Sequence, residues 1–336
     1  MPVTPLTDGF GRVHRDLRIS VTDRCNFRCR YCMPAEGMPW LPRDELLTYE
    51  EIVRVARLLV DRHGFEGIRI TGGEPTVRAH LPVLVAKLAE LRRPDTGTPV
   101  DLALTTNGVA LRSLAHALAE AGLRRVNVSL DSLRPERFAA ITGREALAEV
   151  LDGVDAALEA GLTPVKLNCV VMRGVNDDEL VELAAFGRAR GVTVRFIEYL
   201  PLDAQRAWTA EQVVARDEIV ARIGAVWPLE PVGRADGAPA ERFRFVDGRG
   251  EIGVIPTVTQ AFCDSCDRIR LTAEGRLRTC LFAIDELDLR GPLRAGASDE
   301  ELSGLVARSV RAKWAGHRVG QPVFLRPARS MSQIGG

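Results

Sequence analysis

Residues 14–200 repeat one unit, in which a short β-branched run precedes a longer segment of helical periodicity. Alternating strands and helices imply a parallel sheet with right-handed crossovers, and six such units predict an incomplete (β/α)6 barrel. The predicted strands span residues 17–21, 67–71, 101–105, 125–129, 164–171 and 193–198. The predicted helices span residues 49–63, 81–91, 111–121, 146–160 and 178–190.

The pattern changes after about residue 225, where prolines and glycines interrupt the chain up to residue 239. Short extended runs follow at 242–246, 251–255 and 268–271. We therefore expect an N-terminal tail at 1–13, a barrel domain at 14–230 and a smaller α+β module at 231–336. The string Gly248-x-Gly250-x-x-Gly253 matches the dinucleotide-binding fingerprint, but it joins two extended runs, so it predicts a hairpin turn.

Composition excludes several classes of function. The 45 basic residues balance 45 acidic residues, which argues against a nucleic-acid or anionic membrane partner. No apolar run approaches the ~18 residues of a membrane span, and the first residues lack the apolar core of a signal peptide. None of the three lysines follows a glycine, which excludes a P-loop. A cytoplasmic location is expected.

Seven cysteines carry the strongest chemical signal. An odd number without a signal peptide is not a disulfide framework, and clustered cysteines in such a chain indicate metal ligands or redox groups. Six of them form two tight groups. Cys169 stands alone in an apolar run and is predicted to be a small buried hydrophobic residue.

The first group, Cys25-x3-Cys29-x2-Cys32, follows the first predicted strand. It therefore lies at the carboxyl end of a barrel strand, where β/α barrels place their chemistry. A structural zinc site needs four protein ligands, and no fourth lies nearby. Three thiolates suit a [4Fe–4S] cluster that leaves one iron open to bind a ligand.

The second group is Cys263-x2-Cys266-x13-Cys280. The chain between its last two members predicts a hairpin that turns near residues 274–275, which would set Cys280 opposite Ile269 and bring it back beside Cys266. A zinc ribbon is about as well supported by this spacing alone. The missing fourth ligand favours a second iron–sulfur cluster with an open iron.

Cations recur within the predicted barrel strands. Residues two apart share a face of a strand, so Arg69 lies on the face of Thr71, and Lys166 on the face of Asn168. Buried unpaired charges are costly. Such cations either point outward into ion pairs or line a cavity that holds a polyanion, and their occurrence on several strands favours the cavity.

Four segments together resemble the radical S-adenosylmethionine (SAM) superfamily and, within it, the GTP 3′,8-cyclase family. They are residues 16–33 around the first cysteine group, 70–75 (ITGGEP), 105–108 (TTNG) and 128–131 (VSLD). The resemblance runs over nearly the whole chain. It implies a partial radical SAM barrel with a C-terminal module that carries a second cluster. It also implies a lyase that converts GTP to (8S)-3′,8-cyclo-7,8-dihydroguanosine 5′-triphosphate, the first step of molybdenum cofactor biosynthesis.

The resemblance also assigns cofactors and residues. It implies two [4Fe–4S] clusters, a SAM-cleaving one on Cys25, Cys29 and Cys32 and a second on Cys263, Cys266 and Cys280. SAM would contact Tyr31, Gly73, Ser129 and Leu200. GTP would contact Arg18, Arg69, Thr105, Lys166, Arg195, Arg268 and Arg270. The chain departs from the family pattern at Asp267, where asparagine is usual, and at Leu200, where methionine is usual.

The C-terminal Gly335–Gly336 pair matches a double glycine that is implicated in the family's activity, although simple fraying would also explain such a tail. The expected partners are GTP, an electron donor such as a flavodoxin system, cyclic pyranopterin monophosphate synthase downstream, and a second copy of the chain in a homodimer. Two other functions stay open. One is a radical SAM peptide-modifying enzyme with an auxiliary cluster, and the other is a zinc-binding module without enzymatic activity.

Overall fold

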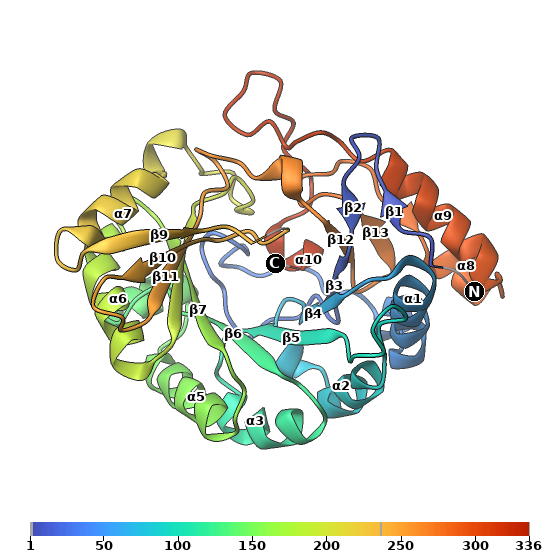
Figure 1. Cartoon of the computed structure of the whole chain (residues 1–336), viewed down its shortest axis with the longest axis horizontal. Coiled ribbons are helices and arrows are strands. Elements are labelled where there is room, and N and C mark those ends of the chain that lie inside the picture. Colours follow the sequence, from blue (N-terminus) through green and yellow to red (C-terminus); the bar gives the residue numbers. More distant parts are fainter. Residues whose placement is uncertain (1–2, 236, 336) are drawn as a thin grey trace.

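The six predicted strands form one parallel sheet. The computed structural model describes residues 3–235 and 237–335. Each strand pairs in parallel with the next one along the chain, and Figure 1 shows them as an arc with helices outside it. The strands are β3 (Asp16–Ser20), β4 (Gly67–Thr71), β5 (Asp101–Thr106), β6 (Arg125–Ser129), β7 (Val165–Val171) and β8 (Thr193–Glu198).

Helices cover the outer face of this sheet, where apolar strand residues such as Leu17 and Ile19 are fully buried. They are α1 (Tyr49–His63), α2 (Leu81–Ala89), α3 (Leu111–Glu120), α4 (Pro135–Thr142), α5 (Leu147–Glu159), α6 (Leu180–Arg190) and α7 (Arg216–Gly224). Local signals fix their ends. A capping box of Thr48 and Glu51 begins α1, and Gly64 in the left-handed conformation ends it. Helices α4 and α7 were not predicted from the sequence.

Strands from the C-terminal part of the chain extend the sheet at both ends. On one side β12 (Arg268–Leu271) runs parallel to β3, followed by β13 (Arg276–Arg278) and β14 (Leu287–Asp288). On the other side β11 (Glu251–Ile255) runs parallel to β8, followed by β10 (Glu241–Phe245) and β9 (Leu229–Gly233). Within the described residues β14 and β9 are the two edges of the sheet and do not pair, so the barrel is incomplete, as predicted.

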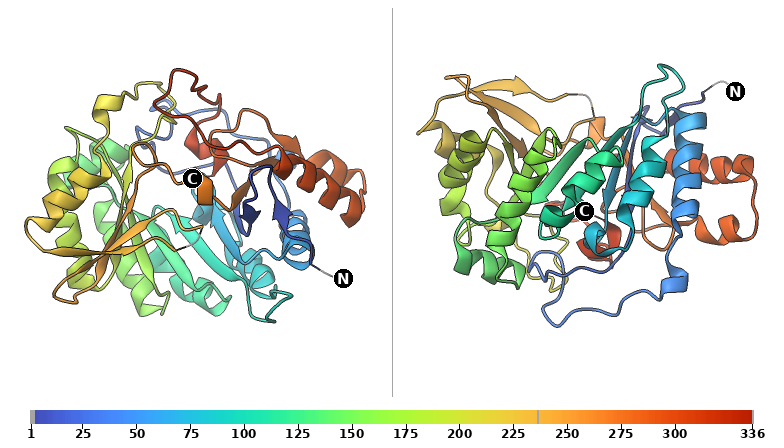
Figure 2. Two further views of the ribbon diagram at one scale, coloured as in Figure 1. Left: turned by 45° about the horizontal axis from the view of Figure 1, so that its top comes forward. Right: turned by 90° about the horizontal axis from the view of Figure 1, so that it is seen from below.

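The remaining elements lie at the periphery, with one exception. Strands β1 (Leu6–Thr7) and β2 (Val13–His14) form a separate hairpin. Helices α8 (Arg290–Arg294) and α9 (Asp299–Arg311) lie outside the arc, whereas α10 (Met331–Ile334) lies inside it in the views of Figures 1 and 2. The division into domains at residue 230 stays a prediction. Strands on both sides of it belong to one continuous sheet, which marks no boundary there.

The two predicted hairpins had different outcomes. Strands β10 and β11 form an antiparallel hairpin around Gly248 and Gly250, as predicted. In the other, Arg270 pairs with Arg278, so continuing the register places Cys280 level with Arg268, and the predicted pairing with Ile269 is wrong by one residue. The cause is a three-residue loop that ends at Gly275 (φ +83°) in place of a two-residue turn.

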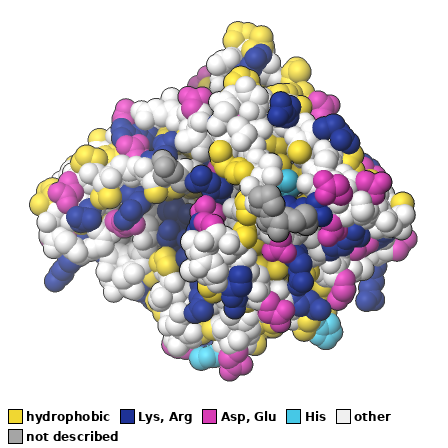
Figure 3. Space-filling view, turned by 45° about the vertical axis from the view of Figure 1, so that its right-hand side comes forward, with side chains coloured by type: hydrophobic (Ala, Val, Ile, Leu, Met, Phe, Trp, Pro, Cys, Tyr) yellow, Lys and Arg dark blue, Asp and Glu magenta, His cyan; other side chains and the backbone are white. Residues whose placement is uncertain are grey.

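The surface carries both signs of charge. On the face drawn in Figure 3, basic and acidic side chains are interspersed. Ion pairs such as Arg112 with Asp152 join neighbouring helices. Among the helices of the described residues, none combines the length and apolar character that crossing a bilayer requires.

Candidate active site

Two adjoining cavities lie inside the arc of strands. The volume of each is about 200 Å³. The first is lined by Cys25, Cys29 and Cys32, and the second by Cys263, Cys266 and Cys280. Both cavities share the lining residues Thr105, Asn168, Ile197, Leu200 and Met331. They are therefore two ends of one chamber, with a cysteine triad at each end.

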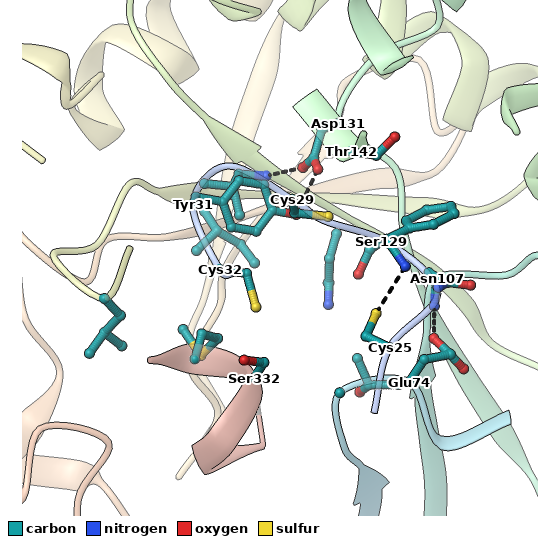
Figure 4. A pocket seen from close by; sticks show the side chains of 18 of the residues that line it. Cys25, Cys29, Tyr31, Cys32, Glu74, Asn107, Ser129, Asp131, Thr142 and Ser332 are labelled. Atoms are coloured by element: carbon teal, nitrogen blue, oxygen red, sulfur yellow. Dashed lines mark hydrogen bonds between the residues drawn. The ribbon is translucent and has the colours of Figure 1, made fainter. Parts of the chain in front are cut away.

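The first triad lies on the loop that follows β3. Its three cysteines surround a common space, which Ser332 of α10 faces from the other side (Figure 4). The loop rests directly on the glycine pair after β4, because the Gly73 N–H donates to the carbonyl of Thr22 at 2.7 Å. A Cβ at Gly73 would lie 2.5 Å from the carbonyl oxygen of Arg24, so only glycine permits this approach.

The thiols of the first triad are neutral in the absence of a metal. Burial raises the pKa of Cys25 to about 11 and that of Cys32 to about 12, and it raises the pKa of Cys29 further above its ordinary value. A thiol in such surroundings ionises when a metal centre binds it. In the described part of the chain no three ligating side chains close around a single ion. A cubane cluster does not require that, because its thiolates bind separate irons.

Polar groups at the ends of β5 and β6 complete the first cavity. The Tyr31 hydroxyl donates to Asp131 at 2.7 Å, and burial raises the pKa of that carboxyl to about 6 (Figure 4). Glu74 accepts the Thr106 hydroxyl at 2.7 Å and the N–H of Asn107 at 2.6 Å. The four residues expected to contact SAM line this cavity, namely Tyr31, Gly73, Ser129 and Leu200. Asp131 was missed as a site residue, although its position just after a predicted strand could have indicated it.

The second cavity presents a row of arginines. Arg270 of β12 lies level with Arg18 of β3, which lies level with Arg69 of β4. Burial lowers the pKa of Arg18 and Arg69, and it lowers that of Arg270 to about 10. No carboxylate pairs with any of the three in the described residues, and the Nε atoms of Arg18 and Arg69 have no hydrogen-bond partner there.

Further polar residues continue this lining. Arg195 donates to the side-chain oxygen of Asn168 at 3.0 Å and to that of Asn127, and burial lowers the pKa of Arg195 to about 9. Thr105 and Arg268 also line the second cavity. Lys166, by contrast, lines neither cavity, although burial and the neighbouring Arg195 lower its pKa to about 8.

The second triad has different electrostatic surroundings. Cys263 and Cys266 flank a single helical turn, and Cys280 follows β13. Cys280 lies in the bend after β13 and lines the second cavity together with its neighbours Thr279 and Leu281. Burial would raise the pKa of Cys266, but the positive charges of Arg268 and Lys313 outweigh it and lower this pKa to about 7. The surroundings of Cys266 thus stabilise its thiolate, whereas burial raises the pKa of Cys263.

The C-terminal tail enters the chamber between the two triads. Met331 lines both cavities, and the carbonyl of Gly335 accepts the Arg270 guanidinium at 3.1 Å. Gly335 has φ +81°, and a Cβ there would lie 2.7 Å from the Thr71 hydroxyl and 2.9 Å from the Cβ of Ser20. Gly335 is therefore held in the chamber and is not frayed, whereas Gly336 lies outside the described residues.

Comparisons with known proteins define the class. Residues 19–187 match the Radical SAM superfamily, and residues 192–319 match Molybdenum Cofactor Synthesis C. Streptococcus suis SuiB, solved with its precursor peptide SuiA, shares the fold at a TM-score of 0.58 and 14% identity, over 80% of this chain and 60% of SuiB. The anSMEcpe structure with bound AdoMet matches at a TM-score of 0.50 and 18% identity, over 64% of this chain and 58% of that chain. The matching family model and the shared fold define the chain as a radical SAM protein, a class that uses a [4Fe–4S] cluster and SAM.

Curated relatives then narrow the class to one family. The GTP 3′,8-cyclase of Streptomyces coelicolor is 48% identical over 98% of this chain and 96% of its own length. The enzyme of Mycobacterium marinum is 48% identical over 99% of this chain and 92% of its own length. The enzyme of Corynebacterium glutamicum is 47% identical over 98% of this chain and 89% of its own length. The chain belongs to the GTP 3′,8-cyclase family.

Proposed function

We propose that this protein is a GTP 3′,8-cyclase that forms (8S)-3′,8-cyclo-7,8-dihydroguanosine 5′-triphosphate in the first step of molybdenum cofactor biosynthesis. Full-length similarity to enzymes of that name supports the proposal. The structural observation that carries it is the row of arginines, which has no carboxylate partners among the described residues and lines the same cavity as the second triad.

That row fits a polyanionic substrate. Three guanidinium groups side by side repel one another, and desolvation adds to the cost. A triphosphate offsets both effects, because its oxygens accept charge-assisted hydrogen bonds from several guanidinium groups at once. We assign the GTP contacts to Arg18, Arg69, Thr105, Lys166, Arg195, Arg268 and Arg270. Of these, Lys166 does not line the cavity, so its contact with GTP rests on the family resemblance alone.

The first triad fits the cofactors of the radical SAM class. Cys25, Cys29 and Cys32 would hold a [4Fe–4S] cluster with an open iron for SAM, and Tyr31, Gly73, Ser129 and Leu200 line the space beside it. When bound, this group supplies the one-electron cleavage of SAM that yields the hydrogen-abstracting 5′-deoxyadenosyl radical. The protein orients SAM and GTP in one chamber and excludes water from between them.

The second triad would hold a further [4Fe–4S] cluster whose open iron meets the guanine base. The donor set fits, because three cysteines line one cavity and Arg268 and Lys313 stabilise the thiolate of one of them, Cys266. A zinc ribbon would need a fourth protein ligand. The chamber would then fix GTP at both ends, with the triphosphate on the arginines and the base at the cluster. This arrangement would orient the ribose toward the first cavity.

The remaining partners follow from the proposed reaction. One-electron cleavage of SAM requires a reductant, for which we propose a flavodoxin-type donor. The cyclised nucleotide would pass to cyclic pyranopterin monophosphate synthase. A homodimer is also proposed. The peptide-modifying alternative is less well supported, because the SuiB likeness at 14% identity reflects the fold alone.

Anaerobic turnover tests the proposed function. The reconstituted protein is mixed with SAM, GTP and a strong reductant, and the products are separated. We expect 5′-deoxyadenosine together with a cyclised GTP derivative. The Cys25→Ala variant should form neither product, and Cys169→Ala should form both, because Cys169 is buried outside both triads. Deoxyadenosine without consumption of GTP would assign the chain another substrate. Absence of deoxyadenosine from an iron-loaded protein would contradict the proposal.

A further inference from the structure

Lys313 is a buried lysine that contacts Cys266 of the second triad and does not line the cavity. It follows α9 directly, and only 4% of its surface is exposed. Its ammonium group lies 3.0 Å from the carbonyl oxygen of Arg268, 3.1 Å from that of Cys266 and 3.5 Å from the Cys266 sulfur. Three acceptors on and beside one cysteine ligand therefore converge on one cation.

The hydrogen-bond network around Lys313 fixes its orientation. A fourth acceptor, His14 Nδ1, lies 3.5 Å from the ammonium, and His14 Nε2 lies 3.1 Å from Asp8. Burial lowers the pKa of His14 to about 4, so its ring is neutral at pH 7. A neutral ring that donates from Nε2 to Asp8 leaves Nδ1 free to accept from Lys313. The imidazole thus links Lys313 to the N-terminal hairpin without neutralising its charge.

A neighbouring cation shows what Lys313 lacks. Arg12 also reaches the second triad, through the carbonyl of Cys263 at 2.7 Å, but its Nε forms an ion pair with Asp8 at 2.6 Å. Lys313 has no carboxylate partner within the described residues. A buried charge requires compensation, and the nearest group able to carry negative charge is the Cys266 sulfur.

The residue type is also informative. Of the 45 basic residues, 42 are arginine and only Lys87, Lys166 and Lys313 are lysine. An ammonium is a compact charge whose three donors turn freely, whereas a guanidinium is a flat fork. Acceptors that converge from different directions, as the Cys266 and Arg268 carbonyls and the Cys266 sulfur do, match the ammonium.

We propose that Lys313 is a positioning residue that holds the Cys266 thiolate and makes the cluster bound by the second triad easier to reduce. A hydrogen bond to a ligating sulfur stabilises the extra negative charge of the reduced cluster, and hydrogen bonding of this kind is one of the factors that set cluster potentials. This inference rests on the second cluster of the proposed function, so the test must separate the two.

Potentiometry of the second triad alone tests the role of Lys313. Cys25, Cys29 and Cys32 are replaced by alanine, so that any iron–sulfur signal comes from the second triad. Redox titration followed by electron paramagnetic resonance then compares Lys313→Met and Lys313→Gln, which both remove the charge, with Lys87→Met. Lys87 is a matched control because it lies on the surface, 3.8 Å from Glu50.

Both Lys313 variants should be at least tenfold harder to reduce, which for a one-electron couple is a midpoint at least 59 mV lower. Lys87→Met should leave the midpoint unchanged. Loss of iron from a Lys313 variant that keeps its circular dichroism spectrum would also support the role in holding Cys266. If either Lys313 variant folds, keeps its cluster and titrates with the midpoint of Lys87→Met, the proposal is overturned. Absence of a cluster while Lys313 is intact would refute the second cluster itself.

Discussion

Neutralising the middle of the arginine row should make the ligand-free protein more stable and the GTP-bound protein less so. Arg18 has a guanidinium neighbour on each side, Arg270 and Arg69, and its Nε is buried without a partner. Like charges opposite one another across strands cost roughly 0.2–1 kcal/mol per pair. Arg18→Met removes two such pairs and keeps most of the apolar stem. The free energy of unfolding without GTP should therefore rise by about 1 kcal/mol.

The same substitution should remove about half or more of the stabilisation by GTP. At a ligand concentration of 100 Kd, binding adds about 2.7 kcal/mol to the free energy of unfolding. Loss of a charge-assisted hydrogen bond costs about 1.5–3 kcal/mol of binding, which raises Kd roughly 10- to 100-fold. At the same GTP concentration the stabilisation should fall to about 0.4–1.4 kcal/mol.

Denaturant unfolding of the anaerobic protein, followed by circular dichroism with and without GTP, measures both quantities. Arg112→Met is the control, because Arg112 lies on the surface and pairs with Asp152 and Glu159 away from the chamber. It should keep the full stabilisation by GTP. An Arg18→Met protein that is destabilised without GTP, yet stabilised by GTP as much as the original chain, would refute the electrostatic reasoning.

Three further outcomes are expected. Burial lowers the pKa of His14 to about 4 in the folded protein, whereas it is 6.5 in the unfolded chain. As the pH falls, the unfolded chain therefore binds the proton first. The free energy of unfolding should decrease by about 3 kcal/mol between pH 6.5 and pH 4. His14→Gln should flatten this slope in denaturation at stepped pH, and an unchanged slope would contradict the assignment. Gly73→Ala should displace the first cysteine loop and roughly halve the iron per chain, which iron analysis checks against the original protein. Deleting Gly335 and Gly336 should leave both clusters intact but abolish product, and full turnover by the truncated chain would disprove a role for the tail.

Local sequence signals were sufficient for most of the barrel. The six strands begin and end within a residue or two of the predictions, because β-branched runs and helical periodicity are short-range properties. The helix ends follow from caps such as Thr48 and Gly64. Alternation of the two kinds of element also sufficed for a parallel sheet and an incomplete barrel.

Part of the candidate site could also be predicted from the sequence. Cysteine spacing picked out both triads, and the period-2 rule put Arg69 on the face of Thr71. The first failure came where one backbone conformation decides a whole register. Gly275 closes a three-residue loop, and this difference of one residue from the expected turn shifted the pairing of β12 with β13 by one residue.

Contacts between distant parts of the chain could not be read from the sequence. Gly335 contacts Arg270 and the end of β3, and Lys313 contacts Cys266. The sequence around Gly335 and Lys313 contains no motif that predicts these contacts. The sequence by itself determined which residue types lie at the ends of which strands, because periodicity and spacing are properties of short segments of the chain. Only the tertiary structure decided which of them share a chamber and which cations lack a carboxylate, because charge compensation and burial depend on everything that packs around a group.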